Sequence, residues 1–331
     1  MRFRLLRSGA VAAALLLAAC QAGTLTPTPS QPQGEASLRA GKAAKETLYV
    51  AVPNGNAVLG FPSGATGNIA PTAKISGSAT DLDGPVGPLF ASSGKLYVSC
   101  GGGNAINVYP AGAKGNASPT QRIVGHKTGL GQPVGIALDA TGRIYVANSQ
   151  LNSVTAYAPK ANGNAAPVLT ISGTSTGLSE PAGLALDSSG KLYVANVKAN
   201  SVTIYAAGAK GNAAPIATIT GPATGLLKPG GLALDSSLNI YVSNFTGNSI
   251  TEFKPGAKNN AKPIRTISGT KTQLDSPTGL WVDVAGTIFI SNSASSTVDS
   301  FAATATGNAA PLTSIGGSKT LLDSPYGVTT F

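Results

Sequence analysis

The sequence predicts an all-β fold, a six-bladed β-propeller of four-stranded antiparallel blades. Three observations predict it: a segment that recurs six times at a spacing of 48 residues, four strand-like runs in each repeat, and chain ends that complement each other. Each repeat is marked by a hydrophobic, an aromatic and a β-branched residue in succession. This anchor begins at Leu48, Leu96, Ile144, Leu192, Ile240 and Ile288.

The four runs of strand-forming residues are clearest in the fourth repeat. They cover residues 183–187, 192–195, 201–205 and 216–220, which are rich in Leu, Ala, Val, Ile and Thr. A tight turn joins the first two runs, and Gly190 supplies the positive φ that such a turn needs. Four antiparallel strands in a unit of roughly 40–50 residues are typical of a propeller blade.

The connections between the runs repeat as well. Asn lies at both ends of the second connection, Gly-Asn-Ala-Ala-Pro or a close variant recurs in the third, and Pro-x-Gly precedes each first strand. No run within residues 45–331 has helical periodicity over the length that a helix needs. Small residues of the first strand are expected nearest the axis, where space is tightest. They are Ala137, Ala185 and Ala233.

The two ends of the repeat region decide between a closed ring and an open stack. Residues 46–49 begin a second strand with no first strand before it, whereas residues 325–331 contain a first strand only. An open stack would need atypical capping repeats, and none is visible in the sequence. We therefore predict that the C-terminal strand completes the first blade and closes the ring.

The N-terminal residues predict export. Residues 1–19 combine a basic start with a short apolar stretch, which is the pattern of a secretory signal. The sequence Leu17-Ala18-Ala19-Cys20 resembles the bacterial lipoprotein signal, which implies cleavage before Cys20 and acylation of it. The alternative is an ordinary signal peptide that contains a Cys. Residues 20–44, rich in Pro, Thr and Gln, are predicted to be a tether, and residues 45–331 the propeller.

The amino-acid sequence of the repeat resembles the NHL repeat of six-bladed propellers. The resemblance rests on Pro-x-Gly-Leu-Ala-Leu-Asp-x-x-Gly-x-Leu-Tyr-Val-Ala-Asn and extends from about residue 44 to the end. Similar propellers include NHL domains that bind protein or RNA, streptogramin lyases, and the gluconolactonase and peptidylglycine-lyase groups. The resemblance implies the fold, but it does not choose a function.

The net charge says less about the partners of the protein than the repeats say about its fold. The net charge is +10, and subtracting Arg2, Arg4 and Arg7 of the signal leaves +7. Recurring lysines in the third connection predict a basic face, which suits either solubility or an anionic lipid or cell-wall polymer. Nucleic acid is not expected as a partner, because Arg is scarce and basic residues do not alternate with aromatic ones. The recurring lysines are Lys114, Lys210 and Lys258, with Lys160 nearby.

Three departures from the repeat are candidate ligand-binding residues. Cys100 replaces an Asn that recurs elsewhere, His126 is the only histidine, and Trp281 replaces a small residue of the first strand. A Cys–His pair is an arrangement that supports nucleophilic catalysis, although a buried Cys and an exposed loop His would be inert. Trp281 is either a packed plug or a ligand platform. The recurring Asn residues are Asn148, Asn196, Asn244 and Asn292.

The sequence predicts no catalytic residue, no metal site and no cofactor. Gluconolactonase-like propellers bind a divalent cation with acidic and Asn ligands, and streptogramin lyases use His. In this chain the recurring acidic residues fall at the turn after the first strand, where Asp bonds backbone amides. The recurring Asn residues suit loop capping or, as the alternative, a ligand site. The recurring acidic residues are Asp139, Asp187, Asp235 and Asp283.

Two functions follow from these observations. The first is a monomeric binding or scaffold propeller, anchored by Cys20 in the bacterial cell envelope and facing away from the cytoplasm. Its partner would be an envelope protein, a cell-wall polymer or a small ligand, and Gln21 favours the outer membrane where there is one. The alternative is a metal-dependent lyase or lactone hydrolase that resembles the propeller enzymes.

Overall fold

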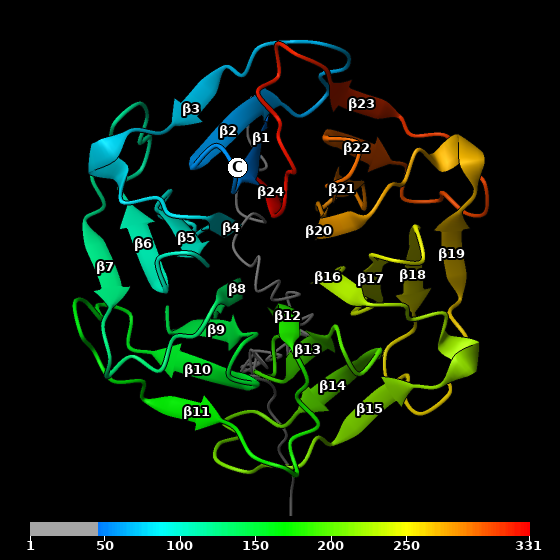
Figure 1. Cartoon of the computed structure of the whole chain (residues 1–331). Helices are drawn as coiled ribbons and strands as arrows, with labels where there is room; N and C mark the ends of the chain where they lie inside the picture. The colour runs from blue at the N-terminus through cyan, green and yellow to red at the C-terminus, as the bar shows by residue number, and fades with distance from the viewer. Residues whose placement is uncertain (1–45) are drawn as a thin grey trace, which may run out of the picture.

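The structure, a computed structural model, describes residues 46–331, which form a closed ring of six four-stranded sheets (Figure 1). This arrangement confirms the predicted six-bladed propeller. The predicted signal, the acylated Cys20 and the tether lie outside the described residues.

Each blade contains four antiparallel strands, termed a to d from the axis to the rim. In that order the strands of blade 1 are β24 (Val328–Thr330), β1 (Thr47–Val52), β2 (Ala57–Pro62) and β3 (Ala73–Ile75); of blade 2, β4 (Pro85–Phe90), β5 (Leu96–Cys100), β6 (Ala105–Tyr109) and β7 (Gln121–Val124); of blade 3, β8 (Pro133–Leu138), β9 (Ile144–Asn148), β10 (Ser153–Tyr157) and β11 (Leu169–Ile171); of blade 4, β12 (Pro181–Leu186), β13 (Leu192–Asn196), β14 (Ser201–Tyr205) and β15 (Ala217–Thr220); of blade 5, β16 (Pro229–Leu234), β17 (Ile240–Asn244), β18 (Ser249–Phe253) and β19 (Arg265–Ser268); and of blade 6, β20 (Pro277–Val282), β21 (Ile288–Asn292), β22 (Thr297–Phe301) and β23 (Thr313–Gly316).

The predicted and observed strands differ mainly at strand a of blade 4. It begins at Pro181 and ends at Leu186, so Asp187 lies in the turn rather than in the strand. The Asp187 carboxylate accepts hydrogen bonds from the backbone N–H groups of Ser189 and Lys191, both at 2.9 Å. This confirms turn chemistry for the recurring Asp. The same contacts recur at Asp139, Asp235 and Asp283.

The ring is closed by the C-terminal strand, as predicted. β24 pairs with β1, joining Val50 to Val328. Beyond the paired residues, Thr47 and Phe331 exchange two backbone hydrogen bonds of 2.9 and 3.0 Å. In Figure 1 the last strand lies beside the first, so blade 1 is assembled from both ends of the chain.

Neighbouring blades are also joined at the rim, by the connection between strands c and d. In blade 4 this connection crosses onto strand d of blade 3, where Gly211 pairs with Ile171. The next residue, Asn212, accepts a hydrogen bond of 2.7 Å from the backbone of Ser175. The recurring Gly-Asn therefore ties each blade to the blade before it. The six bridges are Gly67 to Ile315, Gly115 to Ile75, Gly163 to Ile123, Gly211 to Ile171, Asn259 to Ile219 and Gly307 to Ile267.

At the axis, the glycine of Pro-x-Gly lets adjacent strands a touch through their backbones. A Cβ on Gly183 would lie 2.6 Å from the carbonyl oxygen of Gly230 in the next blade. The equivalent distance from Gly327 to Val86, across the closure, is 2.2 Å. Only glycine permits this approach. The axis retains a cavity of about 80 Å³ lined by the six strands a.

Strands b and c are buried on both faces, which explains their continuous apolar sequence. The 3₁₀ helices in the described part of the chain lie in connections between strand d and the next strand a. None is long and apolar enough to cross a membrane. They are η2 (Ser78–Thr80), η3 (Pro222–Thr224) and η4 (Thr270–Thr272).

Candidate functional site

The ring has two faces with different loops. The d–a and b–c connections form one, here termed the basin face, and the a–b and c–d turns form the other, the turn face. The basin face contains a depression of about 770 Å³, which is bordered by loops of blades 1 to 4. Its polar or aromatic lining includes Gln132, Gln150, Asn152, Glu180, Lys198 and Tyr326.

Tyr326 is the residue at this depression that the sequence analysis missed. It occupies the middle position of Pro-x-Gly in blade 1, and it lines both the basin and the axial cavity. The repeat carries a signal that would have identified it, because the other five residues at this position are smaller and not aromatic. They are Val86, Val134, Ala182, Gly230 and Thr278.

The loops around the basin are held by neighbouring blades. The backbone N–H of Glu180 donates to the side chain of Asn152 at 2.7 Å, and that of Gln132 donates to Asn104 at 2.6 Å. Both Glu180 and Gln132 have positive φ, near 50°, so these contacts fix an uncommon conformation. The basin therefore combines a fixed rim of amide and charged groups with one aromatic side chain at its floor.

The recurring Asn at the end of strand b is a structural cap. In blade 4 the Asn196 side chain accepts from the backbone of Ser179 at 3.1 Å and donates to the Thr203 hydroxyl at 3.0 Å. Asn196 is fully buried, so it is unavailable to a ligand in the basin. Asn148, Asn244 and Asn292 make equivalent contacts to the loop before their blade.

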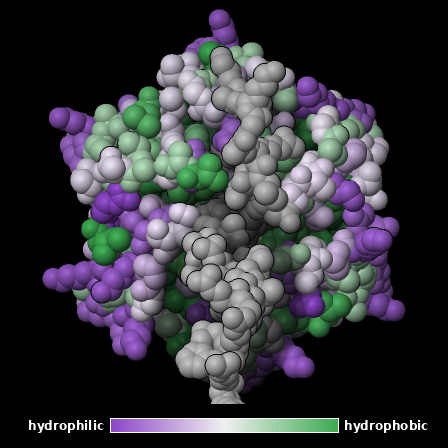
Figure 2. All heavy atoms as spheres, turned by 180° about the vertical axis from the view of Figure 1, so that it is seen from behind, coloured by the Kyte–Doolittle hydropathy of each residue, from purple (hydrophilic) through white to green (hydrophobic). Residues whose placement is uncertain are grey.

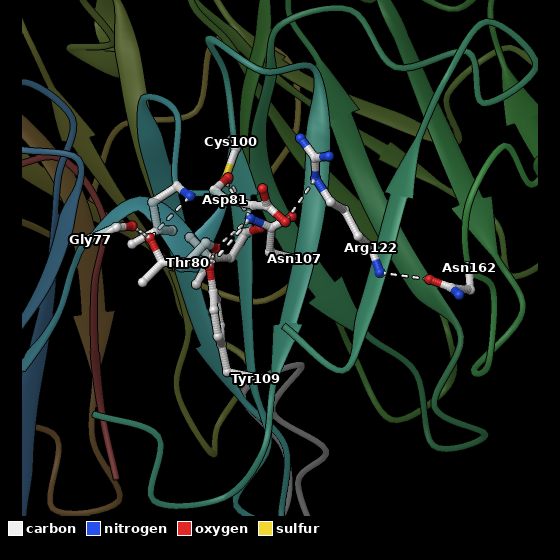
Figure 3. A network of polar contacts seen from close by, with 10 residues as sticks. Gly77, Thr80, Asp81, Cys100, Asn107, Tyr109, Arg122 and Asn162 are labelled. Atoms are coloured by element: carbon white, nitrogen blue, oxygen red, sulfur yellow. Dashed lines mark hydrogen bonds and ion pairs between the residues drawn. The ribbon is translucent and has the colours of Figure 1, made fainter. Parts of the chain in front are cut away.

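Blade 2 replaces this cap by a rearranged set of side chains, drawn in Figure 3. Cys100 stands where Asn recurs, and Asn107 stands on strand c where Thr recurs. The Asn107 amide donates to the backbone oxygen of Asp81 at 2.8 Å and lies 3.5 Å from the Cys100 sulfur. The amide has moved from strand b to strand c, and Cys100 fills the space that remains.

Cys100 is consequently predicted to be unreactive in the folded protein. It is fully buried, and burial raises the pKa of its thiol from 9.0 to about 11. We expect a thiol reagent such as Ellman's reagent to modify Cys100 at least about a hundredfold faster in denaturant than in the native protein. The Cys20→Ser variant makes Cys100 the only thiol in this measurement. Rapid modification of the native variant would contradict the assignment.

Blade 1 also lacks the recurring Asn, and apolar side chains take the place of the cap. Val52 stands at the Asn position, and strand c carries Leu59 and Phe61 where Thr and Tyr recur. All three side chains are buried in one hydrophobic cluster. An apolar set has replaced a hydrogen-bonded one as a unit, so the side-chain donors and acceptors of the cap are absent together. The changes at Val52 and Cys100 are therefore each accompanied by a second change on strand c of the same blade.

His126 and Cys100 are not brought into contact. His126 is exposed at the rim, in the loop after β7, and its Nδ1 lies 3.3 Å from the side-chain nitrogen of Asn164 in blade 3. Cys100 is enclosed in a hydrophobic cluster that blade 2 shares with Val58 and Ile75 of blade 1. The sequence hypothesis of a Cys–His nucleophile has no geometric support among these contacts.

Trp281 is packed between blades rather than presented to the basin. It is 5 % exposed, pairs across the sheet with Phe289, and contributes to the cluster that joins blades 6 and 1. Part of its surface lines the axial cavity, which Tyr326 also lines. Trp281 is therefore a plug, and it shares the axial cavity with Tyr326.

Asp299 is a further buried ionisable group, which the sequence analysis did not single out. It is 1 % exposed on β22, at the position of Thr203 in blade 4, and accepts from Asn292 at 2.7 Å. Burial raises the pKa of its carboxyl from 3.8 to about 6, although hydrogen bonds to the carboxylate offset part of the effect.

This pKa predicts a pH dependence of stability. Because the folded pKa exceeds the unfolded one, the folded state binds the proton more tightly, and stability falls as pH rises from about 4 to about 6. The total fall is on the order of 3 kcal/mol. We expect Asp299→Thr to abolish this component in urea unfolding measured across that range, and exposed Asp323→Asn to retain it. Equal pH profiles for the native protein and Asp299→Thr would contradict the prediction.

The described residues do not offer a metal-binding cluster. Within residues 46–331, no three His, Cys, Asp or Glu side chains are grouped so that they could hold an ion. At the basin, Glu180 is the acidic side chain of the lining, and its neighbours are amides, hydroxyls and Lys198. One carboxylate with a lysine in the same lining supplies little of the negative charge that protein sites offer a divalent cation, although the amide oxygens could serve as ligands.

The comparisons with known proteins agree with this architecture. Residues 16–224 match the family described as SMP-30/Gluconolactonase/LRE-like region. The comparison with curated protein sequences returns no match.

Solved structures with the same fold share little sequence with this chain. A chain of a nidogen/laminin complex is 16% identical with a TM-score of 0.60, and covers 86% of this chain and 98% of its own. A Bacteroides caccae protein of unknown function is 9% identical with a TM-score of 0.64, covering 87% and 99%. A streptogramin B lyase is 13% identical with a TM-score of 0.52, covering 78% and 71%. At these identities the likeness shows the fold alone.

Proposed function

This chain belongs to the SMP-30/gluconolactonase/LRE-like family, and from that premise we propose that it is a membrane-tethered extracytoplasmic propeller that binds a small polar ligand. The tether is residues 20–44, anchored by acylated Cys20 after removal of the signal over residues 1–19. The NHL-like character of the repeats is part of this proposal, and the ligand site is the basin.

The observation that supports binding at the basin is the single break in the Pro-x-Gly ring. Five of its middle residues are small or β-branched, and the sixth is Tyr326, on the floor of a depression of about 770 Å³. An aromatic face surrounded by amides, Glu180 and Lys198 suits a ligand with one apolar face and several hydrogen-bonding groups. Soluble fragments of cell-wall glycan and peptide have this chemistry.

Trp281 provides the readout that tests this proposal. It is the chain's only tryptophan and shares the axial cavity with Tyr326. We expect a panel of cell-wall oligosaccharides and muropeptides to contain a ligand that shifts Trp281 fluorescence saturably, with affinity lowered at least about tenfold by Tyr326→Ala. Phe245→Ala, an exposed aromatic on the same face outside the basin, should not change it. A panel without effect, or equal effects of both variants, would contradict the proposal.

The tether is tested separately from the ligand. We expect the native chain to incorporate labelled palmitate and to fractionate with membranes, because two or more acyl chains anchor a protein stably. Cys20→Ser should lose both properties while retaining the fold of the ring. Membrane fractionation that survives this change without acylation would argue for another mode of attachment.

The alternative function is metal-dependent hydrolysis of a lactone or a lyase reaction. The family match favours it, whereas the donor set at the basin does not. The discriminating measurement is turnover of a lactone panel with added Ca²⁺ or Zn²⁺, before and after chelation. Turnover that requires the metal would replace the binding proposal by this one.

A further inference from the structure

The loops of the two faces carry different net charge. Those of the turn face contain nine Lys or Arg against five acidic residues, with Glu46 before β1 included. Those of the basin face contain five Lys against five acidic residues. The net positive charge of the connections therefore lies on the turn face.

The acidic residues of the turn face are also less available than its lysines. The recurring Asp carboxylates bond backbone amides within their turns, and Asp187 is 5 % exposed. Lysines of the turn face are exposed. They include Lys95, Lys160, Lys191 and Lys254. A surface approaching this face would consequently meet ammonium groups first.

Exposed aliphatic side chains border the same face. The residue that follows Pro at the start of strand d is aliphatic in blades 3 to 6, and Thr in blades 1 and 2. Its backbone N–H pairs near the end of strand c that adjoins the turn face, as Ile216 does with Ile204. On the view in Figure 2, hydrophobic groups alternate with protruding hydrophilic side chains around the ring. The four aliphatic residues are Val168 (58% exposed), Ile216 (57%), Ile264 (51%) and Leu312 (62%).

The chain also enters the ring at this face. Strand b runs from the turn face to the basin face, so Thr47, the first residue of β1, lies at the turn face. The proposed tether, residues 20–44, therefore leads to the side of the ring that carries the lysines and the aliphatic residues.

We infer that the turn face, over blades 3 to 5, docks on an anionic lipid bilayer and leaves the basin facing outward. This inference rests on the proposed tether, but its contacts belong to the ring. Lys160, Lys191 and Lys254 lie at the height of the lipid headgroups, and Ile216 and Ile264 insert at the headgroup–acyl boundary. Orientation follows from the contacts, because the opposite face lacks the charge excess.

The test uses the chain from residue 20 with Cys20→Ser, which cannot be acylated. We expect it to sediment with phosphatidylglycerol-containing vesicles but not with phosphatidylcholine vesicles, and to be released as salt is raised. The variant Lys160→Glu, Lys191→Glu, Lys254→Glu should lower the partition coefficient at least about tenfold. The matched control Lys228→Glu, Lys271→Glu, Lys319→Glu places the same charge change on the basin face and should leave partitioning within about twofold.

A double variant of two exposed isoleucines separates docking from simple charge attraction. Ile216→Ser with Ile264→Ser should weaken vesicle binding by a factor that changes little with salt, because it removes apolar burial. Equal loss in both lysine variants, or no binding to anionic vesicles by a folded chain, would overturn the inference. So would binding to isolated peptidoglycan without binding to vesicles. Ligand binding at Trp281 and palmitate incorporation are measured independently, so their failure is distinguishable from failure of docking.

Discussion

Deletion of residues 324–331 is expected to abolish the monomeric fold. The deleted segment contains β24, whose removal leaves β1 without a partner on its axial side and takes away the backbone pair between Thr47 and Phe331. It also removes Gly327, which donates to Val86 at 2.8 Å and completes the axial contacts. An unpaired strand edge at the axis is a template for pairing with another chain. Light scattering and thermal melting should therefore show unfolded or oligomeric protein.

A circular permutant supplies the matched control for this deletion. When residues 324–331 are placed before Glu46 through a copy of the Asp187–Lys191 turn, strand a of blade 1 precedes strand b as in the other blades. We expect this permutant to be monomeric and to melt cooperatively near the native temperature. Monomeric behaviour and unchanged melting of the deletion variant itself would contradict the closure.

Substitution of Gly279 by Val is the second change with a large expected effect. A Cβ at this position would lie 2.2 Å from the carbonyl oxygen of Tyr326 and 2.6 Å from Cα of Gly327, both backbone atoms that cannot rotate away. Separation of blades 6 and 1 at the axis would be needed to relieve the contact. We expect a loss of about 3 kcal/mol or more, measured as the free energy of unfolding in urea.

Gly64→Ala is the appropriate comparison for Gly279. It adds a Cβ to a glycine with no heavy atom within 4 Å, so its effect should stay within about 0.5 kcal/mol. A Gly279→Val variant as stable as Gly64→Ala would show that the axial contacts yield more readily than the packing of adjacent backbones implies.

The candidate site was harder to predict from the sequence than the fold. Cys100 and His126 were singled out because they interrupt the repeat, yet Cys100 is paired with a second change at Asn107 and His126 lies on the rim. Tyr326 also interrupts the repeat, at the Pro-x-Gly motif of the terminal segment, which holds only one strand of its blade. A break in a repeat indicates function only when nothing in the same blade compensates for it.

The sequence by itself determined the blade number, the closing strand and the role of the recurring Asp, because these depend on spacing and on local turn geometry. Only the tertiary structure decided which departures from the repeat lie at the candidate site. Cys100 is buried between blades 1 and 2, Trp281 is buried between blades 6 and 1, and Tyr326 reaches the basin. Each outcome depends on which neighbours the ring brings beside that residue. The concentration of positive charge on the turn face was likewise decided by folding, because each face collects loops that alternate along the chain.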